Sequence, residues 1–90
     1  MDLPDGMNTR NALREMNHAK AEVDWSGDTL PFVGCYFDGA TPVYRYVGEG
    51  KEVHYNPHNE VFRAIRHTDG ETFTLQAQSV DDGVITLSER

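Results

Sequence analysis

Turn signals recur about every ten residues after position 30 and divide the rest of this chain into segments of strand length. The turns are Asp38-Gly39, Gly48-Glu49-Gly50, residues 56–59, Asp69-Gly70 and Asp81-Asp82-Gly83. The segments between them are rich in β-branched and aromatic residues, which favour strands. Connections this short join only antiparallel neighbours, so the sequence predicts a meander. The expected strands are 31–37, 42–47, 51–55, 61–67, 72–78 and 84–88.

Two of the turns imply a register that agrees on which side chains face the core. If Asp69-Gly70 is a two-residue loop, Ala64 lies opposite Leu75; if residues 56–59 form a four-residue loop, Val53 lies opposite Phe62. A slip by one residue would move the whole apolar set to the other face. The predicted core face carries Val53, Phe62, Ala64, Phe73, Leu75 and Ala77.

The opposite face of these strands is largely polar, and the register pairs Arg63 with Glu52 across neighbouring strands. Val61 and Ile65 interrupt the polar pattern. Three interpretations follow: the helix covers this face in part, the sheet closes toward a barrel, or the face is an interaction surface.

The Gly48-Glu49-Gly50 turn leaves the orientation of two tyrosines open. A two-residue loop turns Tyr44 and Tyr46 inward, whereas a three-residue loop turns Val43 and Val47 inward and both tyrosines outward. Inward tyrosines would belong to the core, and outward ones to a binding surface.

Before residue 30 the pattern predicts one amphipathic helix. It starts from Asn8 or Thr9 as the N-cap, carries an apolar stripe that includes Leu13, Met16 and Val23, and ends at the breaker cluster of residues 24–28. The predicted fold class is α+β: one N-terminal amphipathic helix packed on a bent six-stranded antiparallel β-meander, or on such a sheet curled into a small barrel.

Ninety residues suffice for one small core without disulfide or metal support. We expect residues 1–8 to be a flexible lead-in and residues 9–90 a single α+β domain. Cys35 is the only cysteine, so an intrachain disulfide is impossible and the chain suits a reducing compartment. The first ten residues lack a secretory-signal pattern, and no apolar run is long enough to cross a bilayer. These features predict a soluble, cytoplasmic protein without a membrane partner.

The net charge of −7 disfavours broad affinity for nucleic acid, because it repels the phosphate backbone. Composition does not separate salt adaptation or a GC-rich genome from an acidic binding surface as the origin of this charge. Residues 43–67 form the least acidic part of the chain, with four basic and three acidic residues. An acidic protein of this size can act as a decoy that occupies a basic surface on a partner. That hypothesis needs Asp5, Glu15, Glu22, Asp24, Asp28, Asp69, Glu71, Asp81 and Asp82 to gather on one flank.

Three of the four histidines lie within residues 53–67, which raises the question of a metal site. Zinc needs three or four converging ligands, yet the predicted register separates His54 from His67 by roughly 20 Å. His58 in the intervening turn, with Glu60 nearby, adds only a weak signal, and His18 is expected on the exposed side of the helix. No nucleophile with a matched base stands out. We therefore predict no metal, no cofactor, no catalytic residues and no enzymatic activity.

The remaining function is recognition of another protein, by a small acidic module or inhibitor. Trp25 is interpreted either as the lid of the core or as an exposed interface anchor. The alternative function is a barrel-like nucleic-acid-binding domain that stacks bases on strand aromatics, and a metal protein or small enzyme ranks below it. A homodimer through an edge strand such as 84–88 is a further option. The predicted binding surface consists of Trp25, Tyr44, Arg45, Tyr46, Glu52, His54, Arg63, Ile65 and His67.

Overall fold

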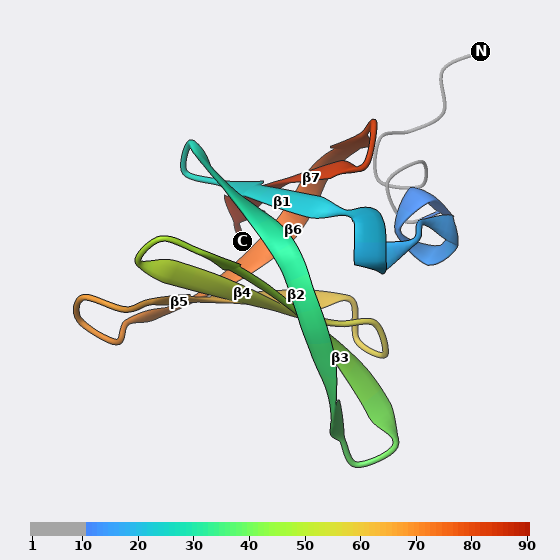
Figure 1. The fold of residues 1–90 in the computed structure, drawn as a ribbon, viewed down its shortest axis with the longest axis horizontal. Helices are drawn as coiled ribbons and strands as arrows, with labels where there is room; N and C mark the ends of the chain where they lie inside the picture. Colours follow the sequence, from blue (N-terminus) through green and yellow to red (C-terminus); the bar gives the residue numbers. More distant parts are fainter. Residues whose placement is uncertain (1–10) are drawn as a thin grey trace.

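The computed structural model describes residues 11–90, whose strands form a closed barrel with neighbours in chain order (Figure 1). Sequential strands pair antiparallel, and the parallel pairing of β1 with β7 closes the barrel. The predicted lead-in at residues 1–8 and the predicted N-cap lie outside the described residues. The strands are β1 (Glu22–Trp25), β2 (Asp28–Asp38), β3 (Thr41–Gly48), β4 (Lys51–Asn56), β5 (Val61–Arg66), β6 (Thr72–Asp81) and β7 (Val84–Glu89).

The predicted α+β architecture of a helix on a six-stranded meander is wrong. Helical residues in the described chain end at position 15, and only the 3-10 turn η1 (His18–Lys20) follows before β1. Ala21, Val23 and Trp25 are buried, whereas the residues between them face outward. This two-residue alternation is a strand pattern, and Val23 happens also to fit the helical stripe. Because the two patterns overlap here, the prediction assigned β1 to the helix and missed a seventh strand.

The breaker cluster after Trp25 forms a hairpin turn and not a helix end. Ser26 and Gly27 both have positive φ, at 55° and 82°, and they connect Trp25 to its cross-strand partner Asp28. Two consecutive positive φ angles match the twist of a two-residue hairpin. The chain therefore reverses here and starts the long strand β2.

The last strand, β7, is not an edge strand. Besides its antiparallel pairing with β6, it runs parallel to β1, with Val23 opposite Ile85 and Trp25 opposite Leu87. Residues 84–88 therefore offer no free edge for the homodimer predicted there. A closed barrel removes the sheet edges that would otherwise invite such pairing.

The predicted registers of β4, β5 and β6 are each wrong by two residues, but the predicted core face is right. Val53 lies opposite Ala64, and Leu75 lies opposite Phe62. The first turn spans residues 57–60, and in the second the amide of Gly70 donates to the carbonyl of Arg66, so the loop is longer than two residues. Because side chains alternate with a period of two, a slip of two leaves every residue on its predicted face.

The β3–β4 turn has the two-residue form, with Gly48 opposite Lys51 and Tyr46 opposite Val53. Tyr46 is fully buried, and Tyr44 is half-buried against the core. Of the two orientations that the sequence allowed, the tyrosines thus take the inward one.

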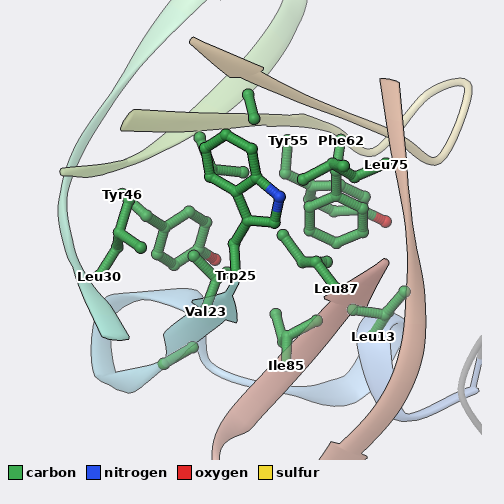
Figure 2. Close-up of a cluster of buried hydrophobic side chains, with 13 residues drawn as sticks. Leu13, Val23, Trp25, Leu30, Tyr46, Tyr55, Phe62, Leu75, Ile85 and Leu87 are labelled. Carbon is green, nitrogen blue, oxygen red and sulfur yellow. The ribbon is translucent and has the colours of Figure 1, made fainter. Parts of the chain in front are cut away.

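The barrel interior is filled by aliphatic and aromatic side chains from the described strands and from Leu13 of the helix (Figure 2). Tyr55 and Phe62 stack with ring centroids 4.3 Å apart, and the tilted rings of Trp25 and Phe73 have centroids 5.3 Å apart. No helix in residues 11–90 has the length and apolar character needed to cross a membrane. The buried residues of the main cluster are Leu13, Ala21, Val23, Trp25, Leu30, Tyr46, Val53, Tyr55, Phe62, Ala64, Leu75, Ile85 and Leu87.

The hairpin of β2 and β3 extends away from the rest of the barrel (Figure 1). β1 pairs with β2 only along Asp28–Pro31, whereas β3 pairs with β2 as far as its tip at Asp38. We call residues 33–43 the arm. Its tip carries Phe37, whose side chain is 71% exposed.

Candidate functional site

The residues predicted to form a binding surface divide between the interior and the outer face of the barrel. Trp25 and Tyr46 are 8% and 0% exposed and belong to the core, so neither is available to a partner. Tyr44 points inward and is half-buried. The other six share the outer face: Arg45, Glu52, His54, Arg63, Ile65 and His67.

Four of those residues meet at the carboxylate of Glu52. His54 Nε2 lies 2.6 Å from Oε1, and His67 Nε2 lies 2.8 Å from Oε2. Arg45 reaches Oε1 at 3.4 Å. On the far side of the His54 ring, Nδ1 is 2.9 Å from the hydroxyl of Tyr36 in the arm. We call these five side chains the Glu52 cluster.

The prediction that His54 and His67 lie at remote ends of the sheet is wrong. With the observed register His54 lies opposite Arg63, four residues from His67 instead of six, and the amide of His67 donates to the carbonyl of Gly50. Glu52 lies between the two histidines on the same face and reaches both. The predicted pairing of Arg63 with Glu52 is wrong for the same reason, since Glu52 lies opposite Ile65.

The cluster changes the acidity of its central carboxyl. Hydrogen bonds from His54 and then from His67 lower the pKa of Glu52 from 4.5 to about 2, against a smaller opposing effect of burial. Each donor stabilises the ionised carboxylate more than the neutral acid. Glu52 therefore stays charged and acts as the fixed acceptor around which the other side chains are ordered.

The Glu52 cluster makes stability depend on acid pH. Because the folded pKa lies below the unfolded value of 4.5, the contribution of Glu52 is fully present above pH 4.5 and is lost as the pH falls toward 2. We expect the melting temperature of wild type to exceed that of Glu52→Gln at pH 7, and the difference to shrink between pH 4.5 and 2. Thermal unfolding monitored by circular dichroism across this range measures it.

The matched control is Glu49→Gln, which removes one negative charge from the exposed β3–β4 turn. It reports the effect of the charge change alone. A difference between wild type and Glu52→Gln that stays constant down to pH 2 would contradict the assigned role of the histidine bonds.

Both nitrogens of His54 are occupied in the neutral ring. A carboxylate only accepts, so Nε2–H donates to Glu52, and Nδ1 is left to accept the hydroxyl proton of Tyr36. The chain of bonds ties the arm to β4. It leaves His54 without a free nitrogen for a ligand, which favours an orienting role over that of a general base.

Beside the Glu52 cluster lies a groove of about 250 Å³ on the outer face, which we call the outer groove. Val43 belongs to this outer face, yet it is only 4% exposed and lies outside the main core cluster. Tyr36 lies opposite Val43 across the arm. The lining residues are Tyr36, Asp38, Val43, His54, Asn56, Asn59, Val61, Arg63 and Ile65.

Arg63 is the cation of the outer groove. It is exposed, and within residues 11–90 no ion pair or side-chain hydrogen bond engages its guanidinium. Arg66, near the other end of β5, is by contrast held by Asp69 at 2.9 Å and Glu71 at 3.0 Å. An unpaired guanidinium beside an apolar floor offers five donors to a carboxylate or a carbonyl.

His18 is not on an exposed helix surface as predicted; it lies half-buried in an aromatic cluster. Its ring stacks on Tyr44 with centroids 4.4 Å apart and on Tyr55 at 5.4 Å. Nδ1 is 2.6 Å from the hydroxyl of Tyr46, and Nε2 is 3.2 Å from the carbonyl of Leu13. Burial lowers the pKa of His18, so the neutral ring is the stable form in the folded protein.

Sequence reasoning missed Tyr36, Val43 and the two asparagines of the outer groove as site residues. The signal was present for the first two: a two-residue loop at Gly39-Ala40 sets Asp38 opposite Thr41 and Tyr36 opposite Val43. Nothing local in the sequence indicated that Asn56 and Asn59 flank the same groove.

Within residues 11–90, no three histidine, cysteine, aspartate or glutamate side chains are grouped so that they could hold a metal ion. His58 lies exposed in the β4–β5 turn, where its amide donates to Asn56. Comparison of the chain with protein-family models, curated proteins and solved structures gave no match.

Proposed function

We propose that this chain is a non-catalytic protein-interaction domain that binds an extended segment of a partner in the outer groove. The observation that carries the proposal is a pair of half-buried apolar side chains on the outer face, Val61 and Ile65, which line the groove beside the unpaired guanidinium of Arg63. The outward face of a small barrel is ordinarily polar, and exposed apolar side chains with a polar rim mark interaction sites.

The chemistry of the groove defines the partner segment. An apolar side chain of the partner would cover Val61 and Ile65, and a neighbouring carboxylate would bind Arg63. Tyr36 and His54 form the wall toward the arm, and their hydrogen bond to each other holds that wall in one conformation. Pre-organisation of this kind reduces the entropy lost on binding.

Two other hypotheses have less support. Of the acidic residues that the decoy hypothesis needs on one flank, Asp28 pairs with Lys51, and Asp69 and Glu71 pair with Arg66, which leaves these three less available to a basic partner. The nucleic-acid hypothesis needed an outward stacking surface, but the rings of Tyr44 and Tyr55 stack on His18 at the inner side. We carry neither forward.

The test is selection of peptides from a random phage-displayed library on the immobilised chain. We expect the selected peptides to share an apolar residue next to an acidic one, and to shift the amide resonances of Val43, Val61 and Ile65 in NMR titrations. Arg63→Ala should weaken their binding about tenfold, the loss expected for one charge-assisted contact at an exposed site.

Arg66→Ala is the matched control, because it removes an arginine from the same strand away from the groove. It should leave peptide affinity within about twofold of wild type. Peptides that bind Arg63→Ala and wild type equally, or resonance shifts confined to another face, would refute the proposed site.

A further inference from the structure

One edge of β2 is open along the arm. The amide of Phe32 donates to the carbonyl of Ala21, but from Val33 to Asp38 no strand within residues 11–90 pairs with the side of β2 that faces away from β3. The backbone groups that point to this side are available to another strand. Unpaired edges of this kind are templates for strand addition.

This edge has little of the usual protection against pairing. Val33 is 53% exposed, Tyr36 42% and Phe37 71%, and Cys35 is exposed as well. Within residues 33–38, Asp38 is the only charged residue, and there is no lysine or proline. Natural edge strands that remain single carry such residues or are very short. A register shift between Phe32 and Gly34 interrupts the edge, so the regular segment is residues 34–38.

The turn at the tip determines which residues face the open side. Gly39 has a positive φ of 65°, and the two-residue loop makes Asp38 and Thr41 the closing hydrogen-bonded pair. Bonded and non-bonded pairs alternate along an antiparallel ladder. Asp38, Tyr36 and Gly34 therefore bond to β3, and the amides and carbonyls of Cys35 and Phe37 point to the open edge.

We propose that this edge pairs antiparallel with the same edge of a second copy of the chain, about a two-fold axis at Tyr36. In that register Cys35 of each copy bonds with Phe37 of the other, so every open backbone group in the regular segment is satisfied. A register one step toward Phe32 meets the irregular part of β2, and one step toward the tip shortens the ladder. The pairing is isologous, since each copy contributes the same residues.

Charge is consistent with a second copy as the occupant. The charge of −7 on each chain opposes association, but residues 34–37, where the two copies meet, carry no charge. Each Asp38 lies opposite Gly34 of the other copy, away from the other Asp38. Tyr36 also lines the outer groove, so the two grooves of the dimer lie next to the axis and present two sites to one partner.

The first measurement is the mass of the full chain by light scattering between about 10 μM and about 1 mM, because so short an interface predicts a weak dimer. We expect the mass to rise toward twice that of the monomer, and to rise further at high salt, which screens the repulsion. Phe37→Asp should weaken association at least tenfold while the circular dichroism spectrum stays unchanged. A monomer throughout the range, or an equally strong dimer in Phe37→Asp, overturns the proposal.

A cysteine pair of variants tests the register. In Cys35→Ala/Tyr36→Cys the two thiols lie across the axis, where α-carbons of a non-hydrogen-bonded pair are about 4.5 Å apart. Mild oxidation should give a covalent dimer, because disulfides need α-carbons closer than about 7 Å. Cys35→Ala/Phe37→Cys places the thiols two positions out of register, at about 9 Å by the same strand spacings, and should stay monomeric on a non-reducing gel. The reverse result overturns the two-fold axis at Tyr36.

These outcomes are independent of the proposed function. If the chain is strictly monomeric but binds peptides in the outer groove, the dimer proposal fails and the groove proposal stands. If the chain forms the dimer but binds no peptide, the groove proposal fails and the dimer proposal stands.

Discussion

Phe62→Ala is expected to destabilise the protein by about 3 to 5 kcal/mol, the usual cost of removing a buried aromatic ring from a core. Phe62 is fully buried, stacks on Tyr55 at 4.3 Å and lies opposite Leu75 on the next strand. A domain of this size is stable by about 5 to 15 kcal/mol, so the variant loses a large share of its folded population. Urea unfolding followed by circular dichroism measures the change.

Phe37→Ala is the matched control, since it makes the same chemical change at a side chain that is 71% exposed. At low protein concentration it should alter the free energy of unfolding by less than about 0.5 kcal/mol. Similar losses in the two variants would mean that the arm and not the barrel holds the structure together, and would contradict the assigned core.

Tyr46→Phe is expected to cost about 1 to 3 kcal/mol although it removes a single oxygen atom. The carbonyl of Leu13 accepts from Nε2–H of His18, which leaves Nδ1 to accept the hydroxyl of Tyr46 at 2.6 Å. Without that hydroxyl, Nδ1 is a half-buried acceptor with no donor. Chemical denaturation at pH 7 measures the loss.

Tyr36→Phe is the control for this second prediction, because its hydroxyl bonds Nδ1 of His54 in the same way but at an exposed position. Water replaces the lost donor there, so we expect a loss below about 0.5 kcal/mol. Equal losses at both positions would show that burial of His18 is not what makes its bond important. The burial of His18 also makes stability depend on pH. Because burial lowers the pKa of His18, protonation of its ring favours the unfolded chain, and stability falls as the pH drops below 6.5.

Local sequence patterns predicted much of the fold correctly. Each of the six strands expected from turn residues and alternation overlaps one of β2 to β7, and the core face of Val53, Phe62 and Leu75 is the observed one. Both depend on chemistry within a few residues: glycines that permit a turn, and a period of two that sends alternate side chains to one side.

The first strand was lost because two periods competed over the same residues. Ala21, Val23 and Trp25 alternate as in a strand, but the apolar spacing that runs from Leu13 to Val23 also fits a helix. The deciding interaction is the parallel pairing of Val23 with Ile85, far away in the chain, which no local window contains. The closure of the barrel depends on this same pairing.

The candidate site shows the same division at the level of single residues. Sequence alone determined that Glu52, His54 and His67 share the outer face, because alternation is a local property of each strand. Only the tertiary structure decided that both histidines bond Glu52, and that Val43 forms the floor of a groove beside Arg63. A slip of two residues leaves the alternation unchanged but moves a cross-strand partner by about 7 Å, so the pattern cannot choose among such registers. Loop length and packing across the closed barrel make that choice.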